Sequence, residues 1–153
     1  MGLLQRKNQI GNIVREKLEL NDSEGLMPTL KGDPIAFWLS PTGMGVETDR
    51  LPDFVLEWDH FDEIVRKANA LGGKMYRGDN LVQLSGMKLG QDIPYDCMEG
   101  FIASHLLFME DGQSVTRRST YYSGVLAWAG IITIHKSQGK GSFITVNAKY
   151  RNI

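Results

Sequence analysis

Cysteine is nearly absent from this sequence, because Cys97 is the only one among 153 residues. A single thiol cannot form a disulfide within the chain, so a cytoplasmic location is the simplest expectation.

Long hydrophobic runs are missing as well. The longest apolar stretch without a formal charge, Val125 to Ile134, has ten residues, whereas a membrane-spanning helix needs ~20. The first residues also lack the apolar segment of a signal peptide, and the sequence therefore predicts no membrane association.

Motifs for metal binding and catalysis are missing too. His60, His105 and His135 lie far apart, and none stands at zinc-motif spacing from Cys97. No acidic residue is followed two positions later by lysine, which is the arrangement usual in restriction-type nucleases. Residues 139–142 lack the earlier glycine that a phosphate-binding loop requires. We therefore assign no catalytic residue, no metal and no cofactor.

Acidic and aromatic residues gather in the first half. No histidine or lysine stands at a spacing that would complete a metal site with the acidic residues. We therefore expect them to form a solvated face and helix caps: Asp53, Glu57, Asp59, Asp62 and Glu63. The aromatic ones are expected to form a small core, although an aromatic pocket for an unstacked base is the alternative: Phe37, Trp38, Phe54, Trp58, Phe61 and Tyr76.

Acidic residues are also missing from the whole end of the chain. Residues 112–153 contain six Lys and Arg and no Asp or Glu, whereas the preceding 111 residues contain 11 basic and 18 acidic ones. The formal net charge of −1 therefore hides two regions of opposite sign. This asymmetry indicates that the end of the chain binds a polyanion.

Hydrophobic periodicity predicts an α+β fold. In the first half it predicts helices over 3–19 and 59–71, a strand over 35–39 and an extended segment over 46–57. Asp59 is the expected N-cap of the second helix, and Gly72 and Gly73 end it. Strand-like residues at 75–76 and 81–82 flank a turn. The aperiodic run 85–94 then suggests a boundary between an N-terminal α+β module, 1–90, and a second domain, 91–153.

The second half predicts two helices and a hairpin. Asp96 and Glu99 resemble a capping box at the start of a helix that ends near residues 110–112, with His105 on its apolar side. A second helix is expected over 116–129. Strands over 131–135 and 142–147 then form a hairpin with a polar tip.

The segment TRRSTYYSGVLAWAGII, residues 116–132, resembles the recognition-helix region of winged helix-turn-helix domains, including those attached to some restriction endonucleases. The resemblance covers roughly 95–148 and implies that the last helix enters the major groove of duplex DNA while the hairpin, or wing, touches phosphates or the minor groove. It assigns DNA contacts to Arg117, Arg118, Ser119 and Thr120 on the helix and to Lys136, Gln138 and Lys140 on the wing. The chain departs from the pattern where 111–115 leave little room for a further short helix.

The arginine pair supports the same interpretation. Cations at the start of a helix oppose its dipole unless an anion is near, so Arg117 and Arg118 favour an anionic ligand there. The sequence thus predicts a DNA-binding protein or specificity module of a bacterial or phage restriction or defence system, with double-stranded DNA as partner. Two alternatives are a small metal-dependent nuclease that uses the acidic N-terminal region, and a phage inhibitor whose acidic region occupies a partner protein's nucleic-acid site.

Overall fold

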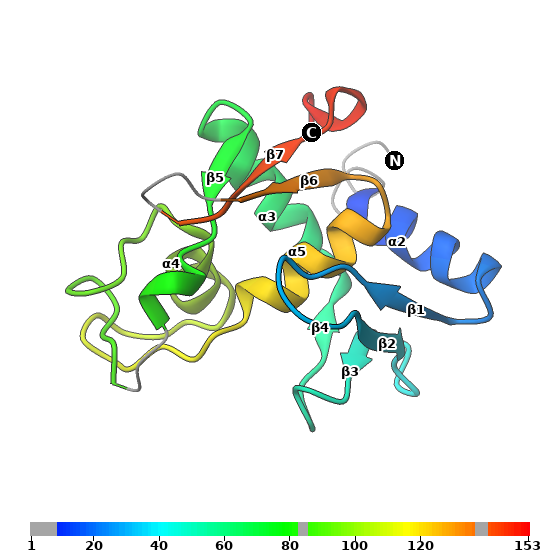
Figure 1. The fold of residues 1–153 in the computed structure, drawn as a ribbon, viewed down its shortest axis with the longest axis horizontal. Coiled ribbons are helices and arrows are strands. Elements are labelled where there is room, and N and C mark those ends of the chain that lie inside the picture. The colour runs from blue at the N-terminus through cyan, green and yellow to red at the C-terminus, as the bar shows by residue number, and fades with distance from the viewer. Residues whose placement is uncertain (1–8, 83–85, 137–140) are drawn as a thin grey trace.

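The computed structural model describes residues 9–82, 86–136 and 141–153, and it confirms a mixed α+β fold (Figure 1). The longer helices are α2 Gln9–Leu20, α3 Trp58–Ala70 and α5 Ser119–Trp128. Shorter helical elements are η1 Asp79–Val82, α4 Met98–Phe101, the π-helical turn η2 Ile102–Leu106 and η3 Ala148–Tyr150. The strands are β1 Glu24–Met27, β2 Ile35–Leu39, β3 Gly45–Thr48, β4 Leu56–Glu57, β5 Lys74–Tyr76, β6 Ile132–His135 and β7 Phe143–Val146.

The strands form two antiparallel sheets. The first has the order β1-β2-β3-β4, and the second has the order β5-β7-β6. In the second sheet Thr145 of β7 lies opposite both Thr133 of β6 and Lys74 of β5. This pairing connects the segments 1–90 and 91–153, whose status as separate modules stays a prediction.

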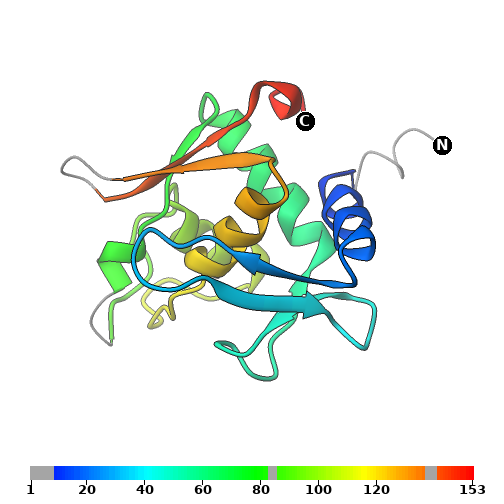
Figure 2. The same cartoon turned by 45° about the vertical axis from the view of Figure 1, so that its right-hand side comes forward.

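Helix α5 lies between the two sheets (Figures 1 and 2). Strand β1 packs closely on it because Gly124 has no side chain; a Cβ there would lie 2.6 Å from Sδ of Met27. The ring of Trp128 meets Phe37 of β2 edge-on, with centroids 5.1 Å apart. Apolar residues of α2, α3, α5 and both sheets share one buried core. The last helix of the chain is therefore a central element of this fold.

Several local predictions are confirmed, and some boundaries are wrong. The strand over 35–39 and the hairpin strands near 131–135 and 142–147 are present. The helix expected over 59–71 begins at Trp58, so Glu57 rather than Asp59 is its N-cap. The extended segment 46–57 is two strands, β3 and β4, and residues 81–82 belong to the 3-10 turn η1 instead of a strand.

The helix near residue 98 differs most from its prediction. It ends at Leu106, before the expected end near residues 110–112, and its second half is the π-helical turn η2. Cys97 is its N-cap and no side chain caps it, so the capping box of Asp96 and Glu99 is wrong. No helix in the described part of the chain is long and apolar enough to cross a membrane.

Candidate nucleic-acid interface

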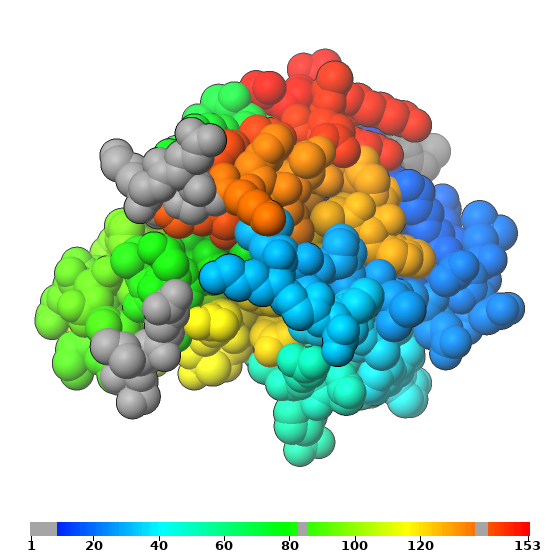
Figure 3. Space-filling view, viewed as in Figure 1, coloured from blue at the N-terminus to red at the C-terminus, as the bar shows by residue number. Residues whose placement is uncertain are grey.

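A cleft of about 640 Å³ opens beside the start of α5. In Figure 3 the blue loop between β1 and β2 lies against the yellow residues before α5 and the orange end of β6. Five cationic residues line the cleft and outnumber its two acidic residues, Asp33 and Asp79: Lys31, Arg50, Arg77, Arg117 and Lys136. The cleft is therefore positively charged in a chain whose net charge is −1.

Arg77 is the buried cation of the cleft lining, because only 4% of its surface is exposed. Its guanidinium donates to Oγ of Ser142 at 2.7 Å, to Oγ of Ser123 at 3.0 Å and to the carboxylate of Asp79 at 3.0 Å. Burial lowers the pKa of Arg77, and Asp79 is the main group that opposes this shift. Because its donors are engaged within the protein, Arg77 holds β5, α5 and the start of β7 together.

The other four cations of the cleft are exposed. Lys31 and Arg50 come from loops beside β2 and β3, Arg117 precedes α5, and Lys136 follows β6. Thr120 and Tyr121, both partly buried, line the same cleft. Exposed Arg and Lys side chains that converge from separate segments provide the donors and the positive charge that phosphate oxygens require.

Three of the residues predicted to contact DNA therefore lie together, namely Arg117, Thr120 and Lys136. Arg118 points elsewhere: its guanidinium carbon lies 4.9 Å from the centroid of the Phe54 ring. Ser119 is fully buried. Gln138 and Lys140 lie outside the described residues.

Glu99 explains why an arginine pair can stand at the start of α5. Its carboxylate accepts hydrogen bonds from the backbone N–H of Arg118 at 2.9 Å and from Oγ of Ser119 at 2.6 Å, and it is 1% exposed. Burial raises the pKa of Glu99, and hydrogen bonds from Ser119 and Arg118 oppose that shift. A carboxylate at this position also stabilises the helix dipole. The anion that the arginine pair required is thus part of the protein, and the dipole argument for an external ligand is wrong.

The surroundings of α5 limit how it can meet DNA. Every residue from Ser119 to Trp128 is buried or partly buried, since the β1-β2-β3-β4 sheet covers one side and the hairpin sheet the other (Figure 2). An α-helix with its side chains is 10–12 Å wide and the major groove is about 12 Å wide. The helix therefore cannot enter the groove while a sheet lies on it, and only its N-terminal end reaches the cleft.

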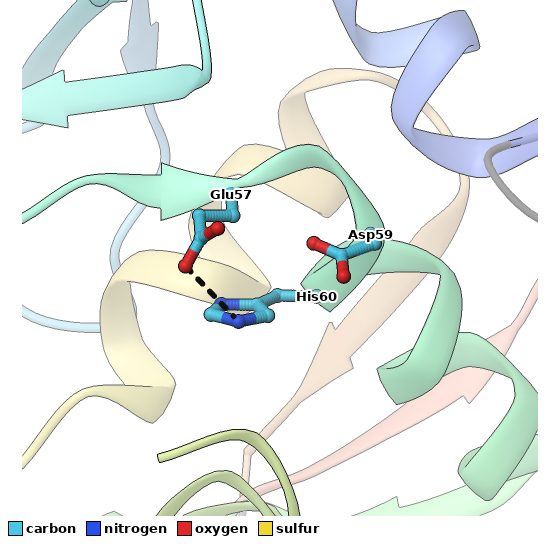
Figure 4. Close-up of side chains that lie close together, drawn as sticks. All are labelled: Glu57, Asp59 and His60. Atoms are coloured by element: carbon cyan, nitrogen blue, oxygen red, sulfur yellow. Dashed lines mark ion pairs between the residues drawn. The ribbon is translucent and has the colours of Figure 1, made fainter.

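A second charged cluster lies where β4 meets α3 (Figure 4). One ligand atom each from Glu57, Asp59 and His60 lies within 4.8 Å of the others. Nδ1 of His60 is 2.9 Å from the hydroxyl of Tyr122, and its Nε2 is 3.5 Å from Oε2 of Glu57. The sequence spacing gave no sign of a histidine beside this acidic group, but the first turn of α3 brings His60 next to Glu57.

The remaining chemically active side chains have local partners. His105, expected in the core, is exposed and lies 3.3 Å from the carboxylate of Glu63. His135 stacks on Phe143, and Nε2 lies 2.8 Å from the hydroxyl of Thr145. Burial raises the pKa of the Cys97 thiol, which disfavours the reactive thiolate.

The sequence did not point to Lys31 and Arg50, which stand among acidic and turn residues of the first half. Only their convergence with Arg117 and Lys136 marks them.

No known protein family, curated protein or solved structure matches the chain.

Proposed function

We propose that the protein binds duplex DNA and that the basic cleft is its contact surface for phosphates. The observation that carries the proposal is the convergence of four exposed cations, Lys31, Arg50, Arg117 and Lys136, on one cleft of a chain that is acidic over its first 111 residues. Such a surface attracts a polyanion through charge and counterion release. A role in restriction or defence rests on the resemblance of 116–132 alone.

The element order supports the winged-helix part of the proposal. Helix α3, strand β5, the α4–η2 helix, α5 and the β6–β7 hairpin follow one another in the order helix, strand, helix, helix, hairpin. A winged helix has this order, and the strand after its first helix pairs with the last strand of the wing. The sheet order β5-β7-β6 agrees with that arrangement. In this assignment α3 is the first of the three helices, so the winged-helix region starts near residue 58 rather than near 95.

The covered α5 favours phosphate contacts over base reading by the helix face. Arg117 and Thr120 would approach the backbone from the start of α5, and Lys136 from the end of β6. Lys31 and Arg50 would approach from the opposite wall. Contacts of this kind set position and affinity but carry little sequence information. We therefore expect binding that depends steeply on salt and weakly on sequence.

The test compares a triple variant, Arg50→Gln, Arg117→Gln and Lys136→Gln, with the wild type in a duplex-DNA titration at several salt concentrations. Each phosphate contact contributes a slope of about −0.9 to log K against log salt. The wild type should give a slope between about −3 and −4, and the triple variant should lose about 3 of it. Arg15→Gln with Lys149→Gln removes exposed cations outside the cleft lining and is the matched control.

Equal slopes for the triple variant and the wild type would refute the cleft as the DNA site. The same preparations separate the alternatives. A nuclease would cut plasmid DNA in the presence of Mn²⁺, whereas a binder leaves it intact. An inhibitor that acts on a partner protein would show no retention on immobilised DNA at physiological salt.

A further inference from the structure

We propose that Glu57, Asp59 and His60 form a binding site for a divalent transition-metal ion. Their three ligand atoms lie within 4.8 Å of one another, a spacing that a small movement of two exposed carboxylates converts into coordination at about 2.0–2.2 Å. All three residues belong to the β4–α3 junction, where Figure 4 shows their side chains close together. The site lies outside the basic cleft lining and does not depend on the DNA proposal.

His60 is the residue that points to a metal. Its side chain is nine-tenths buried, and its Nε2 lies 3.5 Å from Oε2 of Glu57 (Figure 4). Among the described residues Nε2 has only this contact with Glu57 and no hydrogen bond. The other ring nitrogen lies 2.9 Å from the buried hydroxyl of Tyr122. When Nδ1–H donates to that oxygen, Nε2 presents its lone pair to the site, and metal-binding histidines are oriented in the same way by a partner on the second nitrogen.

The charges of the cluster also fit a dication. Asp59 is exposed, and its side chain makes no hydrogen bond or ion pair with any residue in the described ranges. Glu57 is half-exposed, and the contact described for its carboxylate is the one with Nε2 of His60. Two carboxylates this close repel each other. One divalent ion neutralises both carboxylates.

The donor set selects the class of metal. One imidazole nitrogen and two carboxylate oxygens suit Zn²⁺, Mn²⁺ or Co²⁺, whereas Mg²⁺ and Ca²⁺ prefer oxygen ligands alone. The exposed side of the cluster leaves room for water as a further ligand. We expect one Zn²⁺ or Co²⁺ per chain to bind and Mg²⁺ to compete poorly.

The experiment titrates the full chain with Co²⁺, followed by visible d–d absorption, and with Zn²⁺, followed by calorimetry. Asp59→Asn and His60→Gln should each lower affinity about tenfold or more, and Tyr122→Phe, which keeps the ring but removes the oxygen, should lower it by about tenfold. His105→Gln is the matched control, because it removes a second histidine–glutamate pair, which is exposed and lies outside the cluster, and it should leave the titration unchanged. Asp59 is exposed, so Asp59→Asn tests the site even where His60→Gln fails to fold.

Absence of saturable Zn²⁺ and Co²⁺ binding, or equal affinity in the wild type and Asp59→Asn, would overturn the site. Neither result would change the outcome of the DNA titration. Loss of DNA binding in the cleft variant would likewise leave the result of the metal titration unchanged. The two proposals therefore fail separately.

Discussion

The basic cleft and the Glu57–Asp59–His60 cluster are two regions of opposite charge that use the same helix. The cleft takes Thr120 and Tyr121 from the first turn of α5 and Arg117 from just before it, while the acidic cluster is anchored by Tyr122 in the same turn. Adjacent positions on one helix point to different neighbours because side chains rotate by about 100° per residue. The comparison shows that charge is separated around α5 in space. It does not follow the division of the sequence at Gly112, since Lys31, Arg50 and Arg77 belong to the acidic part.

The largest effect that we expect comes from removing Glu99, the carboxylate that holds the start of α5, because both regions use residues of that helix end. Glu99→Ala leaves the backbone N–H groups of Arg118 and Ser119 without their buried acceptor, which should lower the free energy of unfolding by about 3 kcal/mol. Urea unfolding followed by circular dichroism measures it. Glu110→Ala, at an exposed position, is the control and should change stability by less than about 0.5 kcal/mol.

Because both regions depend on the start of α5, Glu99→Ala should also weaken DNA binding and Co²⁺ binding together. Loss of one with full retention of the other would show that the two regions are not organised by the same helix.

The next effect concerns Asp62, a buried carboxylate in neither region. Its Oδ1 accepts the backbone N–H of Ile10 at 2.5 Å, which fastens α2 to α3, while Oδ2 has no partner among the described residues. Desolvation raises the pKa of Asp62 from 3.8 to about 6, against the lowering effect of the Ile10 hydrogen bond. The folded protein therefore binds this proton more tightly than the unfolded chain does.

This contribution to stability is fully present below about pH 4 and is lost as the pH rises through about 6. We expect Asp62→Asn, which keeps an acceptor for Ile10, to be less sensitive than the wild type to a change from pH 7 to pH 5, by about 1 to 2 kcal/mol. Unfolding at the two pH values measures it. Identical pH dependence in the two proteins would exclude Asp62 as the titrating group. Asp62→Asn also helps to compare the basic cleft with the Glu57–Asp59–His60 cluster. In this variant, binding at both regions can be measured from pH 5 to pH 7 without the contribution of Asp62 to the pH dependence of stability.

The smallest effect separates two neighbouring arginines. Arg117→Gln should weaken duplex-DNA binding several-fold and make the salt slope shallower by about 0.9, because Arg117 is exposed in the cleft. Arg118→Gln should leave the slope unchanged, because Arg118 packs over Phe54. Equal losses in the two variants would mean that both side chains reach DNA, which the cleft geometry does not predict.

Sequence patterns located the elements whose signals are local. The helix α3 follows from its apolar spacing and from the glycine pair after it, where Gly72 and Gly73 both have positive φ. The capping box at Asp96 failed for the opposite reason. Glu99 has a better partner 19 and 20 residues away, on α5, and a tertiary contact overrides a local cap.

The candidate sites were only partly predictable. Arg117, Thr120 and Lys136 follow from the acid-free end of the chain and its resemblance to winged helices. Lys31 and Arg50 could not be found this way, because a cation in an acid-rich loop has no distinguishing pattern. His60 stands only three residues from Glu57, but its spacing alone does not show that Tyr122 orients the ring.

By itself, the sequence determined an α+β chain, the helix α3, the strand β2, the final hairpin and an end of the chain without acidic residues. Those features depend on neighbours a few positions apart, for which periodicity and turn residues suffice. Only the tertiary structure decided that both sheets cover α5 and that Glu99 stands at its start. It also decided that Arg117 lines the cleft while Arg118 packs over Phe54. It also placed Arg77 against Ser142, 65 residues later. These outcomes depend on which distant segments exclude water together, and no short window of sequence contains that information.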